Sequence, residues 1–532
     1  MGVDTAHPKT HGVFGQDSTV SAIALPPLPT AASPAALPQW WPAVALQPAV
    51  LALAPPAFAD TIVGSYVLGG VPPQLLASTS TAGTAQTDQN SDIAVGGNLA
   101  QSEYGVTGAG IKIGILSDSF NLHGGMAADI ADGDLPANVQ ILKDGSSGND
   151  EGRAMADLIH SVAPGASIAF YTATDGEADF ATGIAALQAA GCNVIVDDVA
   201  YLDEPFFQDG GAVQQAVENA VAGGVSYFTA ASNEGADYVQ QNFAPMQLAP
   251  KGLPGGVVVQ NFATAAAPQP WVDVTLAKGG QLELDMQWDQ PFASIGTGGG
   301  SADSIGMALY NAAGALVAVT QSDLVGGNPV QVLTYVNTTS SSAFRLVVFA
   351  NGGAALPGTF KIINYGNGSI ADAAGTGSGT VIGHEMVAGA NTVGAVAYSN
   401  TTAFGGDNAP EHFSSVGTGE FLLGADGAPL AAPQSTDKVD FLAPDGSVTS
   451  VFAPFFGTSA AAPVAAAVAA LMLQAHPGLT PAQVTGMLEQ SAEPAAGSVL
   501  ATGAGLIWAP GAVQLALGST NSNAATSGGL FG

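Results

Sequence analysis

Residues 456–472 read FGTSAAAPVAAAVAALM, and this segment constrains the fold more than any other part of the chain. Almost every side chain in it is small or apolar, which is typical of a helix that is buried on all sides. Gly457 permits a sharp turn before the helix, and Pro463 is tolerated in a first turn, where its missing N–H costs nothing. The segment therefore predicts a central buried helix that begins beside Ser459.

Ser459 has two interpretations at this position. Serine is a favoured N-cap residue, because its hydroxyl accepts a hydrogen bond from a free backbone N–H of the first turn. The free N–H groups and the positive end of the helix dipole also stabilise negative charge, which suits a reacting serine. If an acid, a base and an oxyanion donor occur elsewhere in the chain, they favour the interpretation of Ser459 as a nucleophile.

The composition excludes some classes of partner. Nine Lys and Arg stand against 42 Asp and Glu, so the formal net charge is −33. A surface of this sign repels nucleic acid and anionic membranes and is compatible with calcium. The 532 residues are enough for two or more domains. The single cysteine, Cys192, lies in an apolar run and is predicted to be buried. The sequence does not indicate an oligomeric state.

The N-terminal residues 1–95 are rich in Pro, Ala, Ser and Thr, which predicts a leader and linker. The apolar run 40–59 is divided by prolines, so it does not predict membrane insertion, and it ends in AFA near residue 59. A small-x-small ending is typical of an export cleavage site, which would make the protein secreted. A disordered leader without an export role is the alternative.

From residue 96 the chain alternates between strands and helices. The β-branched run 111–116 predicts a parallel strand covered on both faces, and Asp118 follows its carboxyl end, where open α/β sheets place functional groups. The alternation continues to residue 230 and predicts a doubly wound, mostly parallel sheet with helices on both faces. After a helix that begins at Glu151, the predicted elements are strand 167–171, helix 178–190, strand 193–196, helix 212–222 and strand 225–230.

Residues 262–368 follow a different pattern. Seven short, mostly alternating segments are separated by Gly, Asn, Asp and Ser, which predicts an antiparallel β-sandwich inserted into the α/β domain. Helix and strand patterns resume after it. The predicted domains are a leader and linker at 1–95, an α/β domain at 96–261 and 369–518, the inserted sandwich at 262–368, and a flexible tail at 519–532.

Four segments carry residue types that hydrolysis by a serine requires. GIKIGILSDSF holds Asp118, EGRAMADLIHSVAPGA begins with Glu151, TAASNEG holds Asn233, and FGTSAAAP holds Ser459. In this order, with FLAPDG before the last, they resemble the aspartate strand, histidine helix, oxyanion segment and terminal block of subtilisin-like serine peptidases. The inserted sandwich resembles the pre-peptidase C-terminal type of accessory domain.

This resemblance covers about 101–261 and 375–495, and it implies the subtilisin-like fold and a peptidase that needs no cofactor. It implies Ser459 as nucleophile and Asn233 as oxyanion donor. Glu151 stands in the place of the family's histidine. The sedolisin relatives also use glutamate there, although their aspartate four residues later is Met155 here. Asp118 and Glu151 would share a proton and shift the pH optimum to the acid side of neutrality.

Two histidines compete for the role of base. His160 lies nine residues after Glu151, about 180° around the helix, and is expected to face away from the site. His123 lies in the loop after Asp118 and is a weaker alternative, because a lone loop histidine is usually solvated.

The end of strand 193–196 supplies the predicted substrate-binding residues. The resemblance places Asp197, Asp198 and Val199 at the wall of the substrate cleft. Either carboxylate would then be the second member of a carboxylate pair, or would select basic residues in the substrate. Strand-end acids that only face water are the alternative.

These features predict a secreted serine endopeptidase that acts on extended polypeptide, bound by addition of a strand along the cleft. Two other functions stay open. A protein inactivated by the glutamate substitution would bind peptides or surfaces through its sandwich, and a structural or adhesive protein would also carry an acidic surface. Neither alternative explains why a nucleophile, an oxyanion donor and an aspartate occur together.

Overall fold

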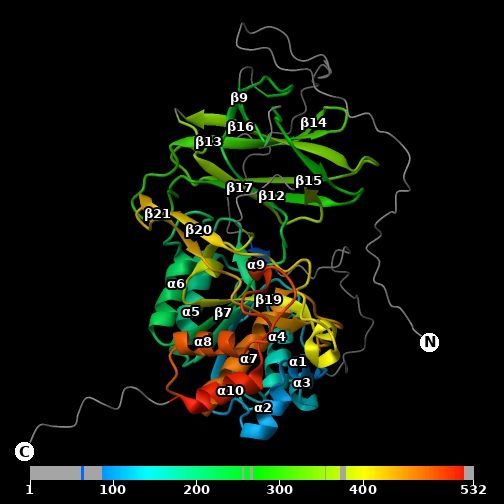
Figure 1. Ribbon diagram of the computed structural model, residues 1–532, viewed down its shortest axis with the longest axis vertical. Helices are drawn as coiled ribbons and strands as arrows, with labels where there is room; N and C mark the ends of the chain where they lie inside the picture. The colour runs from blue at the N-terminus through cyan, green and yellow to red at the C-terminus, as the bar shows by residue number, and fades with distance from the viewer. Residues whose placement is uncertain are drawn as a thin grey trace, which may run out of the picture.

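The computed structural model describes residues 62–64, 87–253, 257–263, 268–320, 322–353, 355–371 and 379–519. An α/β domain forms the lower part of Figure 1, and a domain of antiparallel strands forms the upper part. The predicted export site near residue 59 and the tail from residue 520 lie outside the described residues.

The α/β domain is built on a parallel sheet, as the alternation predicts. Among the described residues it has seven strands, and neighbouring strands run parallel. In spatial order they are β22 (Phe441–Asp445), β19 (Ala390–Ala397), β7 (Ser226–Ala230), β5 (Val194–Asp197), β2 (Lys112–Ser117), β4 (Ser167–Thr172) and β3 (Val139–Lys143).

Helices cover both faces of this sheet. In β2, Ile113 and Ile115 belong to one core and Leu116 belongs to another, so alternate side chains enter different cores. The first core includes α4 (Glu151–Val162), α7 (Thr458–Ala475), α8 (Pro481–Ser491) and α10 (Ala509–Gly518); the second includes α5 (Glu177–Ala189) and α6 (Ala212–Ala222). The other helices are α1 (Asn90–Val95), α2 (Gly97–Tyr104), α3 (Met126–Asp132) and α9 (Val499–Thr502).

The predicted central helix is α7. Its residues from Thr458 to Leu473 are buried, and it packs against α4 and the strands β5, β7, β19 and β22. By length and composition this helix would also be able to cross a membrane, but 89% of the apolar window lies buried inside the protein. Its apolar character is thus accounted for by its place in the core.

The upper domain consists of antiparallel sheets that share one core, formed by residues such as Leu284, Leu346 and Phe360. One sheet contains β15 (Val330–Val336), β12 (Gln281–Trp288), β17 (Thr359–Asn364) and β8 (Tyr238–Asn242). The other contains β14 (Leu316–Val319), β13 (Asp303–Asn311), β16 (Ala343–Gly353), β10 (Val258–Gln260) and β9 (Pro245–Gln247), with β11 (Val272–Thr275) and β18 (Ser369–Ile370).

The predicted start of this insertion at residue 262 is wrong. Strand β8 pairs with β17, and β10 pairs with β16, so the insertion begins near residue 238. The polar sequence YVQQN does not alternate clearly, which hid β8 from a pattern-based prediction. The two ends of the insertion meet, because the Asp237 carboxylate accepts hydrogen bonds from Ile370 N and Asn364 Nδ2, both at 2.8 Å.

The predicted boundary at residue 95 is also wrong. Val95 and Ala100 are buried in the core that contains α7, and Asp88 N donates to Val448 O at 3.1 Å. The α/β domain therefore already includes residues 87–95. Gly96, with φ of 68°, turns the chain between α1 and α2 so closely to the Trp508 ring that a Cβ would clash with it.

Lys361 of β17 is buried at the junction of the two domains. Its Nζ donates to Gly379 O at 3.0 Å and lies 5.8–5.9 Å from the ring centres of Phe206, Phe207 and Tyr238. Burial lowers the pKa of Lys361 to about 7. The unfolded chain would keep this lysine protonated to about pH 10.4. Its burial therefore opposes folding fully below pH 7, and this opposition fades as the pH rises from 7 to about 10.4.

We expect Lys361→Met to raise the melting temperature by a few degrees below pH 7, because methionine fills the site without a buried charge. The gain should shrink as the pH rises from 7 to 10. Thermal melts over pH 5–10 measure this, with the exposed Lys278→Met as the matched control. A loss of stability that is equal at every pH would contradict the expectation.

Candidate active site

The turn before α7 fixes the place of Ser459. Gly457 has φ of 119°, a conformation that favours glycine, and its N–H donates to Asp445 Oδ2 at 2.9 Å. Asp445 ends β22, so this bond ties the start of α7 to the carboxyl edge of the parallel sheet. Ser459 is the second residue of the helix and is 3% exposed.

Asn233 lies in the loop that follows β7, beside the same turn. Its Oδ1 accepts hydrogen bonds from Thr458 N and Thr458 Oγ1, both at 3.0 Å. These two donors fix the orientation of the amide, so Nδ2 remains the group that can donate to a ligand. A Cβ at Gly457 would lie 3.6 Å from Nδ2, which places this donor next to the turn that carries Ser459.

Two buried carboxyl groups hold the loop of Asn233. Ser232 has φ of 63°, and its hydroxyl donates to Glu385 Oε1 at 2.5 Å. Asn233 N donates to Glu234 Oε2 at 2.8 Å. Burial raises the pKa of Glu385 to about 8 and that of Glu234 to about 7. The hydrogen bond from the Ser232 hydroxyl to Glu385 thus stabilises the uncommon backbone conformation of Ser232.

Asp118 and Glu151 meet at the start of α4. Asp118 follows β2, and its Oδ1 accepts a hydrogen bond from Glu151 N at 2.9 Å, while its Oδ2 accepts one from Asn149 N at 2.7 Å. Glu151 is the first residue of α4 and is 1% exposed. Burial raises the pKa of Asp118, although these backbone N–H groups act in the opposite direction.

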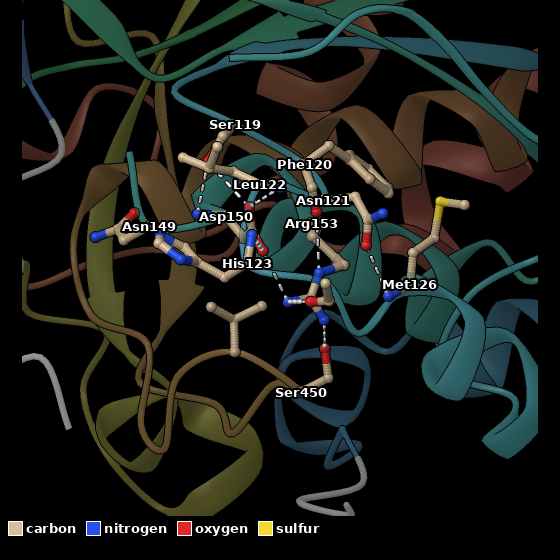
Figure 2. A network of polar contacts seen from close by, with 12 residues as sticks. Ser119, Phe120, Asn121, Leu122, His123, Met126, Asn149, Asp150, Arg153 and Ser450 are labelled. Carbon is tan, nitrogen blue, oxygen red and sulfur yellow. Dashed lines mark hydrogen bonds and ion pairs between the residues drawn. The ribbon is translucent and has the colours of Figure 1, made fainter. Parts of the chain in front are cut away.

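Asp150 links the loop after Asp118 to the start of α4 through hydrogen bonds and an ion pair (Figure 2). Its Oδ1 accepts hydrogen bonds from Leu122 N at 2.8 Å and Ser119 Oγ at 3.0 Å. Its Oδ2 accepts one from His123 N and pairs with Arg153 Nη2, both at 3.1 Å. These bonds make the surroundings of Asp118 and Glu151 a fixed unit.

Of the two alternative histidines, His123 lies in the loop held by Asp150, and His160 lies further along α4. The exposed His123 contacts Gly148 O through Nε2 at 2.9 Å. His160 lies in the last part of α4, where burial lowers its pKa and the charge of Asp134 acts against that change.

The predicted substrate contact of Asp197 is wrong. Its carboxylate is 0% exposed, accepts a hydrogen bond from Thr229 Oγ1 at 2.8 Å, and lies 3.1 Å from His384 Nε2. Side chains alternate along a strand, so Asp197 follows Ile195 into the core of α5 and α6. It therefore points away from the site.

His384 and Glu204 were missed by sequence reasoning. His384, in the turn η1 (Gly383–Met386), lies fully buried between Glu204 Oε1 at 2.8 Å from Nδ1 and Asp197 Oδ1 at 3.1 Å from Nε2. Burial alone would lower the pKa of His384, but the two carboxylates raise it well above its usual value. The signal was the sequence VIGHEM, a histidine and a glutamate in apolar surroundings.

Asp198 lies beside the catalytic candidates. Its Oδ2 accepts a hydrogen bond from Ser117 Oγ at 3.1 Å, and Ser117 precedes Asp118 in the chain. Burial, followed by the charges of Glu151 and Asp118, raises the pKa of Asp198 well above its usual value. Of the two neighbouring aspartates, only Asp198 is hydrogen-bonded to the residue next to Asp118, and its membership of a carboxylate pair stays a prediction.

Val199 begins the short strand β6 (Val199–Tyr201), which pairs antiparallel with β1 (Ile62–Gly64). Gly64 lies opposite Val199. Strand β6 directly follows Asp198, so this extended segment begins next to the Asp198 carboxyl group. A separate hairpin, β20 (Gly419–Leu423) and β21 (Pro429–Thr436), lies near the upper domain (Figure 1).

Among the described residues, no group of three or more His, Cys, Asp or Glu is arranged to hold a metal ion. Calcium binding stays a prediction. Asp118 accepts hydrogen bonds from the backbone N–H groups of Asn149 and Glu151, and Asp198 accepts one from the Ser117 hydroxyl.

Comparison with known proteins gives a family match over most of the chain. The model of the subtilase family matches residues 114–507. The CspB protease of Clostridium perfringens has 14% identity and a TM-score of 0.48, with 81% of this chain and 98% of that chain covered. MycP1 from Mycobacterium smegmatis has 15% identity and a TM-score of 0.35, covering 81% and 86%. No curated protein matches the chain.

Proposed function

Because the chain belongs to the subtilase family of serine peptidases, we propose that it is a secreted endopeptidase in which Glu151 replaces the usual histidine as the base. Ser459 is the nucleophile, Asn233 donates to the oxyanion, and Asp118 is the partner of Glu151. Subtilase catalysis needs no cofactor, and the substrate is a polypeptide.

The observation that carries the proposal is the hydrogen bond from the Glu151 backbone N–H to the Asp118 carboxylate at the start of α4. Helix α4 packs against α7, whose second residue is Ser459. The proposed donor Asn233 is bonded to Thr458, the first residue of α7. All four residues thus come from elements that meet at one edge of the sheet.

In the proposed reaction, the Oγ–C bond forms as the Ser459 proton moves to the Glu151 carboxylate. The carbonyl oxygen becomes an oxyanion, which Asn233 Nδ2 stabilises. Glu151 then gives the proton to the leaving nitrogen as the C–N bond breaks. Water repeats the sequence on the acyl-enzyme: its proton moves to Glu151, and that proton returns to Ser459 Oγ as the acyl–oxygen bond breaks.

A carboxylate base sets the pH range of the proposed activity. Glu151 has to be ionised to accept the Ser459 proton, and a second carboxyl group nearby has to remain protonated to avoid two like charges. Burial favours the protonated form of the second group, and the pKa of Asp118 is raised in this way. The expected optimum lies on the acid side of neutrality.

The edge of β6 is the proposed site of substrate binding. An extended peptide would add to it as an antiparallel strand, in the way that residues 62–64 of the chain do. This arrangement supports an endopeptidase that acts on unfolded segments. The non-catalytic alternative gains no support, because the donor, the nucleophile and the carboxylates keep organised surroundings.

The proposal is tested by incubating purified protein with unfolded casein from pH 3 to 9 and measuring the new amino termini. We expect cleavage with an optimum below neutrality. Absence of cleavage at every pH, from protein shown to be folded and freed of residues 1–86, would contradict the proposed function.

Asn233→Ala should lower kcat by about a hundredfold or more with little change in KM, as expected when an oxyanion donor is removed. Asn233→Asp is the matched variant, because it keeps the acceptor for Thr458 N and loses the donor once ionised. Its activity should fall more steeply than that of the wild type as the pH rises. Unchanged kcat in both variants would place the oxyanion donor elsewhere.

A further inference from the structure

Asp198 has a bonding pattern that the roles assigned so far do not explain. It follows β5, is 4% exposed, and receives one hydrogen bond, from Ser117 Oγ to its Oδ2. Its Oδ1 is buried and makes no hydrogen bond. A buried carboxylate with one satisfied oxygen is costly in its ionised form.

The groups around Asp198 are acidic. The charges of Glu151 at the start of α4, of Asp118 after β2 and of the chain neighbour Asp197 all raise the pKa of Asp198. The cation nearest in sequence to Glu151 is Arg153, which already pairs with Asp129 and Asp150. Within the described residues, no ion pair includes Asp198. A carboxyl group in such surroundings holds its proton.

Side-chain alternation along β5 indicates the face of the sheet on which Asp198, the residue after the strand, is expected to lie. Val194 and Val196 of β5 belong to the core that contains α4 and α7, whereas Ile195 belongs to the core of α5 and α6. Side chains alternate, so Asp198 continues the row of Val194 and Val196. The same alternation sends Asp197 to His384 on the other side.

We propose that Asp198 is the positioning residue of Glu151: its protonated carboxyl group donates a hydrogen bond to the Glu151 carboxylate and holds it as the base for Ser459. This inference rests on the proposed function. The proton of Asp198 is not consumed, because the proton that moves during the reaction is that of Ser459 and later that of water.

The proposal explains why activity should fall at higher pH. When Asp198 ionises, it loses the donated bond and faces Glu151 with a like charge, so Glu151 is no longer held in place. Burial and the charges of Glu151 and Asp118 raise the pKa of Asp198, while the Ser117 hydroxyl acts against this rise. The alkaline limb of the pH profile is therefore assigned to Asp198.

The test compares kcat and KM from pH 3 to 9 for the wild type, Asp198→Asn and Asp198→Ala. Asn keeps a donor that cannot ionise, so Asp198→Asn should retain activity at the optimum and lose the alkaline limb. Asp198→Ala should lower kcat by about tenfold or more, the value of one hydrogen bond to a charged group, with little change in KM. Asp273→Asn, an exposed position in β11, is the matched control and should behave as the wild type.

Ser117→Ala provides a second variant, should Asp198→Asn not fold. It removes the hydroxyl that stabilises ionised Asp198, so the alkaline limb should move to higher pH. An unchanged alkaline limb in whichever of these variants folds would overturn the inference. A change confined to KM for substrates with basic residues would also overturn it, because Asp198 would then be a substrate selector.

The variant Glu151→Gln, measured beside these, distinguishes a wrong role for Asp198 from a wrong choice of Glu151 as the base. If it is inactive and Asp198→Asn keeps the alkaline limb of the wild type, only the role of Asp198 is wrong. If Glu151→Gln keeps near-normal rates, the proposed function itself is wrong in its choice of base, and the role of Asp198 falls with it.

Discussion

Ser459→Ala is expected to abolish peptide hydrolysis while the protein remains folded. The substitution removes Oγ, the atom that forms the acyl-enzyme in the proposed reaction. It leaves the buried helix α7 with a residue of higher helix propensity, and the tie between Gly457 and Asp445 does not involve Ser459. Cleavage of an internally quenched peptide measures the loss, which should amount to several orders of magnitude.

A thermal melt checks that this variant is folded, and its melting temperature should agree with that of the wild type within a few degrees. Peptide cleavage that persists in a folded Ser459→Ala protein, purified from a host that lacks contaminating activity, would remove Ser459 as the nucleophile. Ser459 would then be only a buried residue in the first turn of α7, since the N-cap of this helix is Gly457.

Glu151→Gln is expected to lower kcat by several orders of magnitude, because glutamine keeps the shape of glutamate and cannot take a proton at any pH used. Its backbone N–H still bonds to Asp118, so the start of α4 is preserved. Measurement of kcat and KM from pH 3 to 9 checks this, and KM should change little.

His160→Ala on the same helix is the control for Glu151→Gln. It should cost little activity, because His160 lies about two and a half turns further along α4, on the opposite face. Near-normal rates in Glu151→Gln would contradict the carboxylate base. The role would then pass to another group, with His123 in the loop after Asp118 as the first candidate.

The parallel sheet and α7 could be predicted because their physical signals are local and strong. A buried parallel strand needs apolar residues on both faces, as in residues 111–116, and a helix packed on every side needs small ones, as in α7. The candidate site followed from the same logic, since Asp118 and Asn233 stand at strand ends.

Other features depend on contacts between distant segments, which local patterns do not encode. Strand β8 is recognised as part of the sandwich only through its pairing with β17. The pKa of His384 is raised by Glu204 and Asp197, which the fold brings to it from distant segments. The opposite directions expected for Asp197 and Asp198, by contrast, can be predicted from the sequence, because successive side chains along a strand point to opposite faces of the sheet.

The central claim is that a carboxyl group, rather than an imidazole, activates Ser459. The most direct measurement is the single-turnover rate of acylation of Ser459 by a peptide ester from pH 3 to 9, followed by rapid quench and intact mass spectrometry. The account predicts a bell on the acid side of neutrality, with both limbs set by carboxyl groups. A rate that rises through one group with a pKa near the histidine value of about 6.5, and stays high above it, would contradict the account.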